Sequence, residues 1–145
     1  MPNVRGCNLP DDLLYDVDSH TWFREVEGGN VRIGMTSVAT AMAGQLVAFT
    51  PKKVGRTVDA GKSCATVESG KWVGPVKAPV SGTLIAINEA AIDRPALVNE
   101  DPYGQGWLAK IQPSRWDAEK ASLVSGAEIA PAFEARMNAD GFGGC

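Results

Sequence analysis

The stretch VDAGKSCATVESGKWVGPVKAPVSG, residues 58–82, decides the fold of this chain. Residues typical of strands lead up to Glu68, the four residues SGKW follow, and a second strand-like run returns through Val76. Serine and glycine are common in tight turns, and Gly70 permits the backbone angles that such a turn requires. The pattern predicts a β-hairpin with Lys71 at its tip, where another protein can reach the amine.

Glycine and proline divide the surrounding sequence into short segments. Strand patterns occupy residues 21–27, 30–35, 45–50 and 107–112, and from residue 54 to residue 87 the chain contains strand patterns only. Helical patterns occupy residues 38–43, begin again at residue 114 and occupy residues 126–138, and residues 92–106 form a long connection. Short strands at such close spacing predict a compact β structure curled on itself, because a flat sheet would leave long unpaired edges.

The composition is that of one globular domain covering residues 1–145. A net charge of −3 without a basic run argues against nucleic-acid binding. No apolar run is long enough for a signal peptide or a membrane span, which predicts a soluble, cytoplasmic chain without membrane insertion. The two ends, residues 1–12 and 139–145, are rich in polar residues and glycine or proline and are expected to be flexible.

The reactive side chains are few. The cysteines are Cys7, Cys64 and Cys145, an odd number that does not suggest a disulfide framework. They include no Cys-x-x-Cys pair, and the only histidine is His20, which argues against a metal site. No hydrolytic triad is evident either, so we expect a protein that is not an enzyme. Any chemistry must come from a group added to the chain.

Lys71 stands in a long positional frame. Gly61 lies ten residues before it and Glu68 three before it, while the pair Ala78-Pro79 follows at seven and eight and Gly82 at eleven. This frame resembles that of the biotinyl and lipoyl carrier domains, in which the modified lysine occupies the hairpin turn. Biotin carriers have methionine on both sides of the lysine, and small lipoyl domains have Asp-Lys-Ala. This chain has neither.

Motifs along most of the chain resemble the H protein of the glycine cleavage system. They are Ser19-His20-Thr21-Trp22, residues 31–36 (VRIGMT), residues 67–71 (VESGK), residues 78–82 (APVSG), residues 88–90 (NEA), residues 95–104 (PALVNEDPYG) and residues 106–108 (GWL). The resemblance implies a mainly β barrel-sandwich hybrid with short helices, including C-terminal helices. It also implies lipoate in amide linkage on Lys71 and a lipoate ligase or other lipoylating enzyme as a partner. A carrier must visit several partners, so we expect a monomer.

Two positions depart from that family. H proteins have a glutamate where this chain has Thr21, and a Ser-Asp pair where it has Gly74-Pro75. These carboxylates accompany a cationic aminomethyl cargo, and a sheltered ammonium without them is costly. The motif ESGKWVGP resembles the lipoate-binding proteins of the heterodisulfide-reductase-like sulfur-oxidation system. That resemblance implies a sulfur cargo, with the heterodisulfide-reductase-like complex and dihydrolipoamide dehydrogenase as partners. The alternatives are a glycine cleavage H protein that shuttles an aminomethyl group, and an unmodified binding module.

Beyond Lys71, the candidate cofactor-binding residues are Glu68, Gly70, Trp72 and His20. Glu68 either supports the turn or is recognised by the lipoylating enzyme. Trp72 is either an ordinary cross-strand aromatic or a docking surface for the arm or a partner. His20 either contacts the arm or is a structural residue of a strand.

The cysteines also leave alternatives open. Cys64 lies on the strand before the hairpin and is expected to be a small core residue. Cys7 and Cys145 are either simply exposed or redox partners of the arm or of each other.

Overall fold

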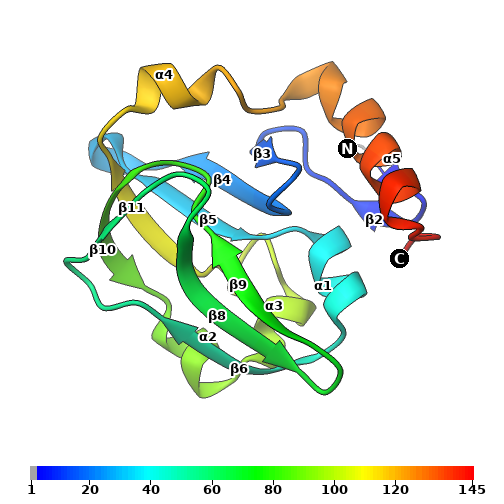
Figure 1. The fold of residues 1–145 in the computed structure, drawn as a ribbon, viewed down its shortest axis with the longest axis horizontal. Coiled ribbons are helices and arrows are strands. Elements are labelled where there is room, and N and C mark those ends of the chain that lie inside the picture. Colours follow the sequence, from blue (N-terminus) through cyan, green and yellow to red (C-terminus); the bar gives the residue numbers. More distant parts are fainter. Residues whose placement is uncertain (1–2) are drawn as a thin grey trace.

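The computed structural model describes residues 3–145. Its strands form three antiparallel sheets, and five α-helices lie around them (Figure 1). The six-stranded sheet has the order β3 (Leu14–Asp16), β4 (Thr21–Glu25), β5 (Val31–Met35), β11 (Ala109–Pro113), β10 (Gly82–Ile87) and β7 (Thr57–Val58). The three-stranded sheet contains β6 (Leu46–Pro51), β8 (Ser63–Ser69) and β9 (Val73–Lys77), and the two-stranded sheet contains β1 (Asn3–Val4) and β2 (Cys7–Asn8).

The two larger sheets share one hydrophobic core. Buried side chains of the six-stranded sheet, such as Phe23 and Ile111, belong to the same cluster as Phe49, Val67 and Val76 of the three-stranded sheet. Alternation of buried and exposed residues along β8 and β9 turns one face of the hairpin inward, as expected for strands with one solvated face. The prediction of a mainly β barrel-sandwich architecture is confirmed.

The helices refine the sequence expectations. They are α1 (Ser37–Ala43), α2 (Glu89–Asp93), α3 (Ala96–Glu100), α4 (Trp116–Lys120) and α5 (Ile129–Asp140). The expected long connection at residues 92–106 contains the end of α2 and all of α3, and both helices are too short for their periodicity to be recognised. Helix α5 buries Ile129, Phe133 and Met137, the face that a spacing of four places on one side. No helix in the described part of the chain has the length and apolarity that a membrane span requires.

The two ends of the described chain are packed together, which differs from the flexible ends expected from composition. Val4, Cys7 and Leu9 are buried in a second core cluster, against which Phe142 packs. Cys7 and Cys145 form a disulfide across 138 residues of sequence. The odd cysteine count was misleading because the third cysteine, Cys64, is a buried free thiol. Residues 1 and 2 of the expected flexible end lie outside the described residues.

Candidate functional site

The hairpin between β8 and β9 presents Lys71, as the sequence predicts. Glu68 pairs with Val73 in the last register position before the turn. The Ser69 N–H donates to the carbonyl oxygen of Trp72 at 2.7 Å, and the Lys71 N–H donates to Ser69 Oγ at 3.3 Å. These bonds close a four-residue turn, which leaves Lys71 exposed at its tip.

Gly70 does not play the conformational role expected of it. It is not one of the glycines with positive φ, and a Cβ at this position would meet no atom within 4 Å. Other residues can therefore adopt its backbone conformation, and the structure shows no steric reason for glycine at this position. Glu68 is exposed and does not line the groove described below.

The side chain of Lys71 lies against the end of α1, a contact that the sequence did not indicate. A Cβ on Gly44, the residue that caps α1, would lie 3.3 Å from Lys71 Cε, and Gly44 has a φ of +83°. Asn99 fixes this cap, because its Nδ2 donates to the Gly44 carbonyl oxygen at 2.9 Å and its Oδ1 accepts from the Leu46 N–H at 2.8 Å. Asn99 belongs to the motif of residues 95–104, and this motif was the signal in the sequence that could have pointed to it.

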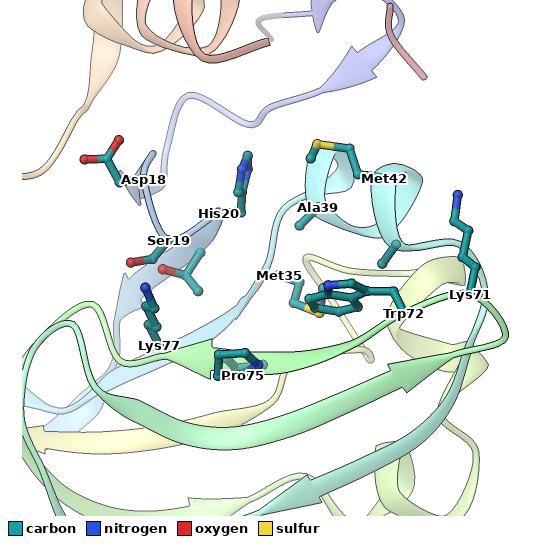
Figure 2. Close-up of a pocket in the computed structure, with 13 residues that line it drawn as sticks. Asp18, Ser19, His20, Met35, Ala39, Met42, Lys71, Trp72, Pro75 and Lys77 are labelled. Atoms are coloured by element: carbon teal, nitrogen blue, oxygen red, sulfur yellow. The ribbon is translucent and has the colours of Figure 1, made fainter. Parts of the chain in front are cut away.

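A groove of about 610 Å³ begins beside Lys71 and continues between the hairpin, α1 and the residues before β4 (Figure 2). Its walls are largely apolar near the lysine, where Met42 and Ala43 of α1 face Trp72 and Val76 of the hairpin. The far end is polar and contains Asp18, Ser19, His20, Thr21 and Lys77. Besides Lys71, two of the predicted site residues therefore line this groove, namely Trp72 and His20. Glu68 and Gly70 do not line it.

Trp72 and Gly74 are sterically coupled. A Cβ on Gly74 would lie 2.1 Å from Cζ2 and 2.7 Å from Cε2 of the Trp72 indole, so the ring occupies the space that any side chain at residue 74 would need. The ring extends from the hairpin into the groove, which Met35 and Pro75 also line (Figure 2). Trp72 is 40% exposed, so about three-fifths of the residue is covered. The glycine at residue 74 and the tryptophan at residue 72 are therefore one packing arrangement.

His20 lies immediately before β4 and not within a strand, with a left-handed φ of +55°. Its Nε2 is 3.5 Å from Oδ2 of Asp140, the last residue of α5. Burial lowers the pKa of His20, and the negative charges of Asp140 and Asp18 oppose this shift while Arg136 adds to it. His20 Nδ1 is buried and has no hydrogen-bond partner among residues 3–145. Helix α5 thus reaches the groove through a contact between residues far apart in sequence.

The positions that depart from the family pattern, Thr21 and Pro75, both line this groove. Thr21 is 1% exposed, and its Oγ1 has no hydrogen-bond partner within the described residues. The carboxylate that does line the groove, Asp18, has an 89% exposed side chain and lies 3.4 Å from Arg136. Residues 3–145 contain no cluster of side chains that could bind a metal ion.

Cys64 has a packing role, as expected. It is 2% exposed, and burial raises the pKa of its thiol to about 11. A thiol of this kind is protonated at neutral pH and is a poor nucleophile.

The barrel-sandwich fold and a lysine on a hairpin tip beside an apolar groove define a carrier protein of the lipoyl and biotinyl type. The chain belongs to the glycine cleavage H-protein family, whose model matches residues 14–136. It is 55% identical over 128 residues to glycine cleavage system H protein 5 of Aquifex aeolicus, covering 86% of each chain. It is 39% identical over 136 residues to a probable glycine cleavage system H protein 2 of Sulfurisphaera tokodaii, covering 92% of each. A crystal structure of the H protein of Mycobacterium marinum matches with a TM-score of 0.69 and 44% identity, over 73% of this chain and 87% of that one.

Proposed function

We propose that this chain is a lipoyl carrier protein, with lipoate attached through an amide to Nζ of Lys71. The observation that carries the proposal is the exposed lysine on the closed β8–β9 turn, which opens directly onto an apolar groove. The groove residues fit a lipoyl group. Met35, Ala39 and Met42 offer its aliphatic arm an apolar surface next to the attachment point at Lys71. When bound, lipoate supplies a reversible dithiol and disulfide pair.

The protein's own contribution is presentation. The turn keeps Lys71 accessible to a lipoylating enzyme, and the Gly44 cap beside it sets one side of the path that the arm follows. Catalysis belongs to partner enzymes, and tethering raises the concentration of the arm at their sites. We infer a carrier that is not itself an enzyme.

Family membership makes the aminomethyl group of glycine cleavage the first cargo to consider. Relatives at 55%, 44% and 42% identity are all named glycine cleavage system H proteins. In this assignment, glycine-cleavage enzymes are the partners, and the chain carries a one-carbon amine between them.

The lining of the groove favours a second cargo, sulfur. The two family carboxylates are replaced by Thr21 and Pro75, and the remaining carboxylate of the groove, Asp18, is largely solvated and near Arg136. Among the residues that line this groove, an ammonium would find no sheltered carboxylate. A dithiol that accepts and passes on a sulfur atom needs none, and its partners would be the heterodisulfide-reductase-like complex and dihydrolipoamide dehydrogenase.

Intact mass spectrometry tests the carrier assignment. After co-expression with a lipoate ligase, we expect a gain of about 188 Da, the mass of one lipoyl amide. The gain must disappear in Lys71→Arg and persist in Lys62→Arg, a matched change at an exposed lysine outside the groove. Absence of the gain in the unchanged protein would refute lipoylation at Lys71.

Aminomethyl loading by glycine decarboxylase separates the two cargoes. Efficient loading of the unchanged lipoylated protein supports the glycine cleavage assignment and contradicts the sulfur assignment. Weak loading that improves at least about tenfold in Thr21→Glu/Pro75→Asp supports the sulfur assignment, because the double change restores the missing counter-charges.

A further inference from the structure

The Cys7–Cys145 disulfide has one inaccessible and one accessible residue. Cys7 is fully buried in the second core cluster, whereas Cys145 is an exposed residue beside β2 (Figure 1). Thiol–disulfide exchange requires a thiolate to reach one of the two sulfur atoms, and access decides which one. Cys145 is therefore the sulfur at which this bond can be opened, with Cys7 as the leaving group.

This disulfide and Lys71 lie at opposite ends of α1. Cys145 Sγ is 3.6 Å from the carbonyl oxygen of Ser37, the first residue of α1. At the other end, Lys71 Cε lies 3.3 Å from the Cβ position of Gly44. Seven residues of helix separate these ends by about 10 Å, at 1.5 Å per residue. Figure 2 shows the Lys71 side chain extended beside the helix that carries Met42.

A lipoyl group on Lys71 has a length similar to that separation. Its chain of covalent bonds from the lysine nitrogen to the nearer sulfur extends about 9 Å, at about 1.3 Å of advance per bond. The remaining cysteine does not compete for exchange, because Cys64 is buried on the opposite side of the hairpin strand from solvent. Within the described chain, the sulfur pair within reach of an arm on Lys71 is thus Cys7–Cys145.

We propose that Cys7 and Cys145 form a second redox site of this protein, which exchanges two electrons with a dithiol carried on Lys71. The proposal rests on the proposed lipoylation of Lys71. Exposed disulfides in other proteins are the labile, regulatory or catalytic ones, and Cys145 gives this disulfide an exposed residue.

The exchange is balanced. Cys145 Sγ accepts the attack of one thiolate, the Cys7–Cys145 bond breaks, and Cys7 Sγ leaves with the electron pair and takes up one proton. The second thiol of the dithiol then releases the Cys145 sulfur, which takes up the other proton. Cys7 and Cys145 gain two electrons and two protons, and the dithiol is oxidised to a cyclic disulfide.

The test is the rate at which a small reductant opens the disulfide. Lipoylated protein and unlipoylated Lys71→Arg are treated with dithiothreitol, and thiols are alkylated at intervals and assigned by peptide mass. At a dithiothreitol concentration of about 0.1 mM, we expect Cys7 and Cys145 to be alkylated at least about tenfold faster in the lipoylated protein, because a tethered dithiol acts at an effective concentration of millimolar order. The lipoylated Lys62→Arg protein must match the unchanged protein.

Equal rates in the lipoylated and Lys71→Arg proteins, with the arm itself alkylated as a dithiol, would overturn the proposal. So would an acceleration that rises with protein concentration, since exchange within one chain is first order. Free thiols at Cys7 and Cys145 in the isolated, air-exposed protein would also overturn it. Failure of lipoylation itself is read separately, from the missing mass gain before any reductant is added.

Discussion

Replacing Gly74 by alanine should disrupt the groove through Trp72. The new Cβ would lie 2.1 Å from the indole ring, so either the ring or the strand must move. The ring is the more mobile of the two, because β9 is paired with β8 along its length while Trp72 is already 40% exposed. We expect the indole to leave the groove.

The expected loss of unfolding free energy follows from the surface of Trp72 that is covered in the folded protein. About three-fifths of the residue is covered, or about 150 Å² of a large aromatic side chain. At about 25 cal/mol per Å², exposing all of it costs about 4 kcal/mol as an upper limit, and we expect Gly74→Ala to lose about 2 kcal/mol of unfolding free energy. The assay is urea unfolding followed by far-ultraviolet circular dichroism.

A double-mutant cycle separates this mechanism from a general strand effect. In a Trp72→Ala background the clash is absent, so Gly74→Ala should cost less than about 0.5 kcal/mol. Gly70→Ala is the matched control, since nothing lies within 4 Å of its Cβ position, and its effect should stay within about 0.5 kcal/mol. If the losses of unfolding free energy in Trp72→Ala and Gly74→Ala simply add in the double variant, the steric coupling of the two residues is refuted. It is also refuted if Gly74→Ala is as stable as the unchanged protein.

Three further predictions concern the surroundings of the groove. Burial lowers the pKa of His20, so the unfolded chain binds the extra proton first, and stability should fall as the pH drops below the unfolded value of about 6.5 until the lower folded pKa is reached. His20→Asn, which tolerates the left-handed backbone, should flatten that part of the urea-unfolding profile between pH 7.5 and 5.5, and an unchanged slope would contradict the assignment. Asn99→Ala removes the bonds to Leu46 N–H and the Gly44 carbonyl, which should cost about 1–3 kcal/mol and speed hydrogen exchange at the Leu46 amide; protection equal to that of the unchanged protein would argue against this role. Phe133→Ala empties a buried site against the Tyr15 ring and should cost about 3–5 kcal/mol in the same urea assay, whereas a loss below about 1 kcal/mol would mean that α5 is not part of the cooperative core.

The local sequence pattern was enough to predict the hairpin and the position of Lys71 at its tip. Alternation along residues 63–69 and 73–77, interrupted by a serine–glycine turn, depends only on neighbours in sequence, and the structure has these strands with Lys71 between them. The same holds for the buried face of α5, because its spacing of four is a property of the helix itself. The helices α2 and α3 are single turns without a recognisable periodicity, so the sequence predicts only a connection over residues 92–106, where the end of α2 and all of α3 lie.

The tertiary structure alone decided what surrounds Lys71. Pairing of Cys7 with Cys145, the position of Asp140 against His20, and the Gly44 cap beside the lysine join residues that are distant in sequence, and no spacing rule connects them. The roles of Trp72 and Gly74 were equally hidden, although the two residues are close neighbours, because the clash depends on a side-chain orientation. Sequence determines which residues alternate, turn and carry an amine, since these depend on local backbone geometry. The groove and the Cys7–Cys145 disulfide depend on how the sheets and chain ends pack, which is a property of the whole core.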